Sequence, residues 1–504
     1  NQIAWVDNST LGNNFFSSGL ATTDQMLDTP TLNWCTLNPN QKFSQFTLSE
    51  GNLKAQNGST WDRGVAATQS VSSGKWYFEA TFTKTSTSGI DTGWASLHGW
   101  DGGSTFVANS DNSYIFVHNG NKWIDGTTSS YGTALTTGDV IMCAFDLDNG
   151  NLFFGQDGTW ENSATVGEIE AGTGTNALSS TIPAGLYTPI GYWSEGTSSS
   201  NAYTEFNFGQ SAFAHTPPTG FLALNTANLA TPSITDGSAY FDTKLWTGDD
   251  VDGRAITGYN FQPDWVWIKS RSGAYSHNIT DAVRGAGIYL QSNTTDTEVT
   301  GPGAFGSTLA FTSDGFTLDN GTYDNLYVNG GGETYVGWAW AANGSGSANT
   351  DGTINSTATS ANTTAGFSIV KYVGNGTSGA TVGHGLGAAP KMLILKDLGV
   401  AENWVIYHEA IGPTKFMYFT TDAAFTASNR WNDTAPTSSV FSLGNETQVN
   451  ASGRNYVVYA FAEIPGYSSF GSYTGNGSAD GPFVSTSMKP AYVLIKRTNA
   501  TENW

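Results

Sequence analysis

The sequence predicts an all-β protein built from several modules. Short runs rich in β-branched and aromatic residues recur along the chain, and clusters of Gly, Asn, Asp, Ser and Thr separate them. The clearest runs are residues 75–82, 139–146 and 264–269. Glycine makes up 61 of the 504 residues, which is above the ~7% usual in proteins and fits many tight turns. Amphipathic helix patterns are nearly absent, and we expect at most one helical turn, at residues 280–284.

Charge and hydropathy exclude several classes of protein. Acidic residues outnumber basic ones 42 to 20, so the net charge is −22. Twenty cations spread over the chain leave no basic surface for nucleic acid, and an anionic membrane would repel the chain. No apolar run reaches the ~18 residues that span a bilayer. Aromatic residues reach 13%, which argues against disorder. We therefore expect neither nucleic acid nor membrane as a partner.

The start of the chain and its two cysteines give weaker expectations. Residues 1–5 contain neither Met nor a basic segment, so we expect the sequence to begin inside a longer protein. Two cysteines cannot form a disulfide framework. Cys143 lies in an apolar run and is expected to be a buried, inert thiol. A single Cys35–Cys143 bridge remains the alternative.

The second half of the chain repeats a frame three times. A glycine is followed after 15, 16 and 15 residues by a proline, and a lysine follows each proline six residues later. The three Pro-to-Lys segments are residues 263–269, 390–396 and 490–496. We expect Pro to open a strand, the apolar residues to cross a core, and Lys to return the chain to solvent.

Further strands and the end of the chain extend this frame. The two complete copies carry a second apolar strand, at residues 335–340 and 456–461. Copy two contains the sequence Glu-Asn-Trp at residues 402–404, and copy three reaches the same sequence at residues 502–504. We therefore expect the natural protein to continue beyond this point. The expected division is a first unit at 31–222, repeat 1 at 223–345, a Ser/Thr/Asn/Gly-rich linker at 346–364, repeat 2 at 365–470 and the start of repeat 3 at 471–504.

The first unit resembles the SPRY (B30.2-like) family, which has a concanavalin-like β-sandwich. The order and spacing of several stretches carry this resemblance: residues 73–79, 138–141, 145–150, 155–158, 187–190 and 206–210, with Phe213. Residues 148–150, Asp-Asn-Gly, supply the chemistry of a tight hairpin turn within it. The resemblance implies a β-sandwich at 31–222, followed by tandem β-rich repeat domains.

The segments around this unit resemble structural proteins of tailed bacteriophages, especially marine ones. Residues 28–39, 258–269 with 281–285, and 382–390 carry this second resemblance. It implies that residues 1–30 are the exit of a preceding lectin-like domain. It also implies a virion component of the tail or its fibres, with other virion proteins and the host surface as partners and without catalytic residues.

Motifs for cofactors and nucleophilic catalysis are weak or absent. Residues 374–379 satisfy the pattern GxGxxG, but no helix pattern follows, so we expect no dinucleotide. His384 lies between two glycines and is expected to be a turn residue, because the other copies lack it. His408-Glu409 lacks the second histidine of a zinc motif. We therefore expect no cofactor and no metal ligand set.

Two groups of acidic residues leave glycoside hydrolysis as an alternative, and one turn leaves calcium binding as another. Paired carboxylates could hydrolyse a glycosidic bond, and the candidate groups are Glu161, Glu168 and Glu170, or Asp249, Asp250 and Asp252. Residues 146–157 resemble the spacing of a calcium loop, with Asp157 at its twelfth position. A β-hairpin is the expected structure there, because the helices that flank such a loop are missing.

Aromatic residues near polar loops are the best candidates for ligand contact. They are Trp100, Tyr114, Trp123 and Trp160. A flat ring stacked on a sugar buries apolar area at little entropic cost. The alternative is that these rings cap the core of the sandwich.

Together with the composition, the resemblance to phage proteins implies a non-enzymatic virion structural protein of a phage tail or tail fibre that binds the host surface. Many weak contacts would act through avidity, and exposed strand edges favour a homo-oligomer, by analogy a trimer. A secreted or cell-surface bacterial adhesin is the first alternative, and a polysaccharide-degrading tailspike enzyme is the second.

Overall fold

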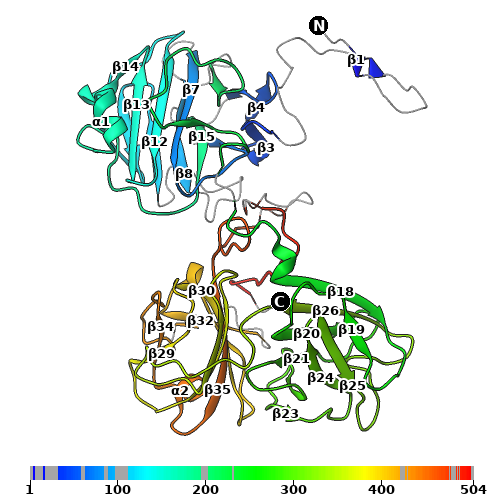
Figure 1. Ribbon diagram of the computed structural model, residues 1–504. Coiled ribbons are helices and arrows are strands. Elements are labelled where there is room, and N and C mark those ends of the chain that lie inside the picture. The colour runs from blue at the N-terminus through cyan, green and yellow to red at the C-terminus, as the bar shows by residue number, and fades with distance from the viewer. Residues whose placement is uncertain are drawn as a thin grey trace. The chain divides into compact units, whose positions relative to one another are not determined.

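The computed structural model describes most of the chain and divides it into two compact units. The described residues are 4–5, 15–16, 32–57, 63–83, 89–96, 112–193, 202–229, 232–419, 426–427, 429–475, 477, 484, 486 and 488–500. Unit 1 comprises Asn1–Ala230 with Ser472–Ser487, and unit 2 comprises Thr231–Gly471 with Met488–Trp504. The expected all-β class is confirmed (Figure 1). Within the described part, no helix is long and apolar enough to span a membrane.

Unit 1 is a sandwich of two antiparallel sheets, preceded by the short pair β1 (Ala4–Trp5) and β2 (Phe15–Phe16). The first sheet has seven strands in the order β11-β10-β9-β8-β15-β6-β3. They are β3 (Leu37–Lys42), β6 (Arg63–Ala67), β8 (Ile90–Ser96), β9 (Ser113–Phe116), β10 (Asn121–Ile124), β11 (Thr127–Ser130) and β15 (Tyr187–Trp193). The second sheet has the order β14-β13-β12-β7-β16-β5-β4, and β17 pairs with β7 in parallel. Its strands are β4 (Phe46–Ser49), β5 (Lys54–Asn57), β7 (Lys75–Thr83), β12 (Val140–Asp146), β13 (Asn151–Gln156), β14 (Thr159–Trp160), β16 (Tyr203–Asn207) and β17 (Leu222–Ala223).

Both faces of the second sheet are buried around β7. Phe78 and Phe82 point into the main core between the sheets, whereas Tyr77 points to the opposite face. That face is covered by the helix α1 (Val166–Ala171), through Ile169. Burial on both faces explains why these strands read as nearly continuous apolar runs.

Unit 2 contains both complete repeats, and each is a small two-sheet module. Repeat 1 has a six-stranded sheet, β18-β26-β20-β21-β22-β23, and a three-stranded sheet, β19-β25-β24. The strands are β18 (Phe241–Thr247), β19 (Ala255–Thr257), β20 (Trp265–Ser270), β21 (Asn278–Asp281), β22 (Ile288–Leu290), β23 (Val299–Thr300), β24 (Ser307–Thr312), β25 (Gly315–Asp319) and β26 (Thr334–Trp340). At the helical turn expected for 280–284, β21 ends at Asp281 and residues 282–284 form a single hydrogen-bonded turn, which Gly285 N closes by donating to Asp281 O at 3.0 Å.

Repeat 2 has the same plan, with one additional edge strand in its large sheet and one strand fewer in its small sheet. Its sheets are β27-β28-β35-β30-β31-β32-β33 and β29-β34, and Figure 1 traces this module from yellow to orange. The elements are β27 (Ala358–Asn362), β28 (Phe367–Val373), β29 (Ala380–Gly383), β30 (Pro390–Asp397), β31 (Val405–His408), β32 (Lys415–Tyr418), β33 (Thr426–Ala427), β34 (Val440–Leu443), α2 (Thr447–Asn450) and β35 (Asn455–Ala462).

The two modules share individual hydrogen bonds as well as strand order. The Tyr335 hydroxyl accepts from Gly330 N at 2.8 Å and donates to Leu326 O at 3.0 Å. The Tyr456 hydroxyl accepts from Ala451 N at 2.8 Å and donates to Thr447 O at 2.6 Å. Each tyrosine also stacks on the aromatic residue of the neighbouring strand, Trp246 in repeat 1 and Tyr372 in repeat 2. These matched contacts identify the two modules as copies of one structure.

The lysine of the repeat frame does not return to solvent, so that expectation is wrong. Lys269 Nζ donates to Ser270 O at 2.7 Å and to Gly273 O at 3.0 Å. Lys396 is fully buried and donates to the equivalent carbonyl of Asp397 at 3.0 Å and to Glu402 O at 2.9 Å. The ammonium group closes the turn after the strand, because it can donate to several carbonyl oxygens at once.

The expected linker at 346–364 is part of repeat 2. Its strand β27 pairs with β28 along five residues. Ile354 belongs to the core of the module, and the buried Ser356 hydroxyl accepts from Asn349 N at 2.8 Å. Small polar side chains satisfy the backbone here, so their abundance marks an edge segment and not a free linker.

An aromatic cluster joins the repeats within unit 2. Trp265 and Trp267 of repeat 1 pack with Met392 and Ile394, which hold the same positions of the frame in repeat 2. The residues between them point the other way, into the core of each module: Val266, Ile268, Leu393 and Leu395. In the third copy, Tyr492 and Leu494 pack on the same cluster, while Val493 and Ile495 are exposed. In every copy, alternate residues of this segment therefore pack on the shared aromatic cluster.

Candidate functional site

Two of the predicted ligand-binding aromatic residues are buried in strands of unit 1. Tyr114 lies in β9 and is 4% exposed, and Trp160 lies in β14 and is 8% exposed. The expectation of exposed loop residues is wrong for both, because each is paired within a sheet and packs into a core cluster. For these two residues the alternative of core capping is confirmed. Trp100 lies outside the described residues.

Trp123 is the predicted residue that remains partly accessible. It lies half-buried in β10 with its ring edge-on to Tyr192, 5.5 Å between ring centres. Across the hairpin it faces Thr128 of β11, whose residues Thr127–Ser130 are all exposed. We call residues 121–130 the edge hairpin, because β11 ends the seven-stranded sheet. The Trp123 ring packs against the edge of the main core and remains partly accessible beside a row of exposed hydroxyl groups.

A buried Asp–His pair, which the sequence analysis missed, anchors this hairpin. Asp91 Oδ1 lies 2.7 Å from both the backbone nitrogen and Nδ1 of His118. His118 belongs to the turn that connects β9 to β10, and the Phe82 ring stacks on it. Both side chains are at most 4% exposed, so the pair holds the turn in place and is closed to a substrate. The only signal in the sequence is an aspartate within an otherwise small and apolar strand.

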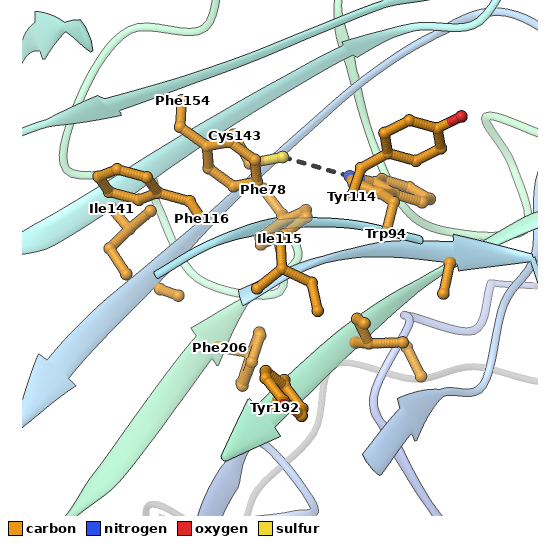
Figure 2. Close-up of a cluster of buried hydrophobic side chains, with 14 of the residues drawn as sticks. Phe78, Trp94, Tyr114, Ile115, Phe116, Ile141, Cys143, Phe154, Tyr192 and Phe206 are labelled. Carbon is orange, nitrogen blue, oxygen red and sulfur yellow. Dashed lines mark hydrogen bonds between the residues drawn. The ribbon is translucent and has the colours of Figure 1, made fainter. Parts of the chain in front are cut away.

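The core behind the hairpin is apolar and buried, and it contains the cysteine thiols. Cys143 Sγ accepts a hydrogen bond from Trp94 Nε1 at 3.2 Å (Figure 2). Cys35 and Cys143 are both free and buried, so the expectation of buried thiols is confirmed and the bridge is not formed. Burial raises the pKa of Cys35 to about 12, which keeps this thiol protonated and unreactive.

The first carboxylate group serves local structure. Glu161 Oε2 accepts from Thr133 N at 3.0 Å, Glu168 Oε1 accepts from Asn176 N at 2.6 Å, and Glu170 Oε1 accepts from Thr219 N at 2.7 Å. Burial raises the pKa of Glu161, although its bonds to Thr133 oppose this. Each carboxylate is occupied by a different backbone segment, and the three do not form a facing pair.

The second carboxylate group ties two loops of repeat 1 together. Asp249 Oδ1 accepts from Val251 N at 3.0 Å and from Asn329 Nδ2 at 2.9 Å. Asp250 Oδ1 accepts from Gly331 N at 2.8 Å, and Asp252 Oδ1 accepts from Asn320 N at 3.0 Å. These bonds hold the pKa of Asp249 below its usual range. Asp252 also faces Asp319, whose pKa is raised by burial and by the neighbouring carboxylate of Asp252. The hydrogen bonds of all three candidate acids fix the geometry of the two loops.

The resemblance to a calcium loop is resolved as the expected hairpin. Asp146 pairs with Lys75 at 3.1 Å, and Asp148 accepts from Gly74 N at 2.7 Å. Asp157 accepts from Val140 N at 2.9 Å, so the three carboxylates turn to separate partners. Nowhere in the described ranges do three His, Cys, Asp or Glu side chains gather in a way that could hold a metal ion.

His384 and the glycine-rich segment of repeat 2 also have structural roles. His384 Nδ1 accepts from Leu386 N at 3.2 Å, and its Nε2 lies 3.1 Å from Thr437 O, with the ring fully buried. The GxGxxG segment leads into the strand β29 and not into a helix. The expectations of a turn histidine and of a chance glycine match are therefore confirmed.

Comparison with known proteins identifies both units. A family model described as "Domain of unknown function (DUF7483)" matches residues 236–504. The model of the SPRY domain matches residues 75–169, which confirms the SPRY-like character of unit 1.

Several known proteins are similar to about a third of this chain. The E3 ubiquitin-protein ligase RKP of Arabidopsis thaliana is 30% identical over 156 residues, which is 31% of this chain and 11% of that protein. The chain therefore spans about a tenth of the length of this curated relative. The SPRY domain of human HERC1 has 16% identity and a TM-score of 0.28, with 35% of this chain and 99% of that one covered. The PSpry domain of TRIM65 has 14% identity and a TM-score of 0.25, with 35% and 91% covered.

Proposed function

The chain belongs to the DUF7483 family, and we propose that it is a non-enzymatic structural protein that binds a cell surface as part of a phage tail or tail fibre. The observation that carries the binding function is the edge hairpin of the SPRY domain. It offers the half-buried Trp123 next to exposed hydroxyl groups, on a turn held by the Asp91–His118 pair. A rigid aromatic ring with polar neighbours binds a surface group with little loss of entropy.

The absence of catalysis in this proposal rests on how the acids are used. The carboxylates that could act as a pair accept hydrogen bonds from backbone amides, as Glu168 and Asp250 illustrate. A general acid or base must reach a proton of the substrate, and the hydrogen bonds of these two carboxylates instead hold them against the backbone of neighbouring loops.

The phage origin rests on the resemblance of residues 258–269 and 382–390 to phage structural proteins. In this setting the repeats of unit 2 form a stiff spacer, and other virion proteins are the partners that hold it in the tail. A homo-oligomer, by analogy a trimer, would multiply weak surface contacts. Mass spectrometry of purified phage particles from a host that encodes this chain should detect it in the tail fraction. Its absence from the particles would contradict this part of the proposal and favour an adhesin.

A single substitution tests the binding function. Trp123→Ala should weaken adsorption of the purified chain to bacterial cells by about tenfold or more, as expected when a central aromatic contact is removed. Val166→Ala removes another accessible apolar side chain of unit 1, 48% exposed, and should leave adsorption unchanged. Equal adsorption of the two variants would contradict the assignment of the edge hairpin. Melting temperatures of both variants show whether unit 1 is still folded.

A further inference from the structure

Repeat 1 carries a highly exposed aromatic ring that has no counterpart in the described part of repeat 2. Tyr323 is 81% exposed, the largest value for a big hydrophobic side chain in the part of the chain that the structure describes. It lies in the loop between β25 and β26, which we call the Tyr323 loop and define as residues 320–327. The core of the module does not need this ring, because the ring buries little surface there.

The Tyr323 loop is an insertion relative to repeat 2. Two equivalent hydrogen bonds align the modules: Trp246 Nε1 donates to Val328 O, and the Tyr372 hydroxyl donates to Val449 O. Ten positions separate Leu318 from Val328, but the equivalent residues of repeat 2, 443 and 449, are six positions apart. Repeat 1 therefore holds four additional residues at this point, and the shared module folds without them.

The backbone of the inserted loop is held rigidly. The amides of Thr322, Tyr323 and Asp324 donate to Gly303 O or Ala304 O at 2.9 to 3.0 Å. Asn325 accepts from Gly321 N and donates to Asp250, both at 3.2 Å. A loop fixed in this way keeps its exposed ring in one place before any partner arrives, so binding would lose little conformational entropy.

The surroundings of the ring define the chemistry of a partner. Phe305 supports Tyr323 edge-on, with 6.1 Å between ring centres, and itself packs on Tyr327 at 4.6 Å. The charged side chains of the loop and its hydrogen-bond partners are carboxylates: Asp324 in the loop, Asp250, which accepts from Asn325, and Asp252, which accepts from Asn320 N. An anionic polymer would be repelled here.

We propose that the Tyr323 loop is a second binding site of this chain, which takes an uncharged glycan. A sugar ring needs one flat aromatic face and a few hydrogen-bonding groups at its edge. Tyr323 supplies the exposed ring, and the polar residues Thr322 and Asp324 flank it in the sequence. A stable protein partner would require roughly 800 Å² with an apolar centre, which one isolated ring does not provide. The inference rests on the proposed surface-binding function, and it adds a site outside the SPRY domain and a ligand class.

The test is binding of the full chain to immobilised oligosaccharides, with uncharged and sulfated forms of the same backbones side by side. The chain should bind uncharged forms, Tyr323→Ala should reduce this binding about tenfold, and Tyr323→Phe should retain most of it because the ring face remains. Leu309→Ala is the matched control, since Leu309 is a 44% exposed side chain of the same repeat and lies in β24. Because Tyr323 is so exposed, its substitution should leave the melting temperature unchanged.

Several outcomes would overturn this inference. They are binding only to sulfated forms, binding to no oligosaccharide, or equal binding by Tyr323→Ala and the unmodified chain. Adsorption to cells, measured in parallel with Trp123→Ala, separates the two proposals. If Trp123→Ala loses adsorption while Tyr323→Ala binds glycans normally, the second site is wrong and the SPRY site stands. If the unmodified chain binds neither cells nor glycans, both proposals are wrong.

Discussion

The Tyr459 hydroxyl donates a hydrogen bond to the Asp281 carboxylate over 2.8 Å, and the two residues belong to different copies of the repeat. Arg284 completes the contact, with its Nε 2.6 Å from Asp281 Oδ2. All three side chains are buried. The Tyr459 hydroxyl of repeat 2 thus contacts a buried ion pair of repeat 1, next to the aromatic cluster that the two modules share, so we expect unit 2 to unfold as one body.

Removal of the arginine tests this coupling. Arg284→Leu would leave the buried Asp281 charge without its main partner, which typically destabilises by about 3–5 kcal/mol. Tyr459→Phe removes one hydrogen bond and should cost about 1–2 kcal/mol. Urea unfolding followed by tryptophan fluorescence measures both changes. The exposed pair Lys391–Glu409 is the control, and Lys391→Ala should change stability by less than about 1 kcal/mol. Similar losses for Arg284→Leu and Lys391→Ala would contradict the coupling.

Acid should weaken the interface between the repeats through His277. Its Nδ1 accepts a hydrogen bond from Trp267 Nε1 at 2.7 Å, so the ring must be neutral at that atom. Burial, together with the charge of Lys269, lowers the pKa of His277 to about 4 from 6.5. Between these values the unfolded chain binds the proton and the folded chain does not, so stability is present above pH 6.5 and is lost as the pH falls to 4.

The size of this acid effect is up to about 3 kcal/mol, by the usual conversion of a pKa difference. His277→Gln keeps a hydrogen-bond acceptor but does not titrate in this range. We expect the melting temperature of the unmodified chain to fall more steeply between pH 6.5 and 4 than that of the variant. Parallel curves would show that His277 does not carry this dependence.

Tyr335 and Tyr456, the matched tyrosines of the two modules, should contribute equally to the free energy of unfolding. Tyr335→Phe and Tyr456→Phe each remove a hydroxyl that accepts one backbone hydrogen bond and donates another. Leaving such groups unsatisfied costs about 1–3 kcal/mol. Differential scanning calorimetry should record similar losses for the two variants. A large loss for only one would mean that the modules are not energetically equivalent copies.

The stability that the shared aromatic cluster provides should depend strongly on the buried ring of Trp265. Trp265 is 1% exposed and contacts Trp340, Tyr459 and Phe367. Trp265→Ala should destabilise by about 3–5 kcal/mol, as for other buried aromatic deletions. Tyr492, from the third copy, is only half-buried on the same cluster, so Tyr492→Ala should cost less. An equal or larger effect of Tyr492→Ala in thermal unfolding would contradict this order.

The repeat and its strands could be predicted because they depend on local chemistry. Proline at the start of the strand and glycine in the turn restrict the backbone wherever they occur, and the same frame recurs with nearly constant spacing. The burial of the Lys396 side chain could not be predicted. Its hydrogen-bond acceptors are backbone carbonyl oxygens, and their positions depend on the folded turn.

The candidate sites were less predictable for a related reason. Tyr114, Trp123 and Trp160 all neighbour polar loops in the sequence, and only strand pairing decides which ring is covered. Tyr323 was overlooked because one tyrosine in a glycine-rich loop carries no pattern. Its significance comes from comparing two folded copies, which reveals the four inserted residues.

The central claim is that this chain binds a cell surface without cleaving it. The most direct measurement incubates the purified chain with surface polysaccharide from a strain that it adsorbs to, and follows bound protein and new reducing ends together. We predict saturable binding and no increase in reducing ends at any protein concentration. Reducing ends that accumulate in proportion to the protein, and that disappear with Glu161→Gln or Asp250→Asn, would contradict the account and identify a depolymerase.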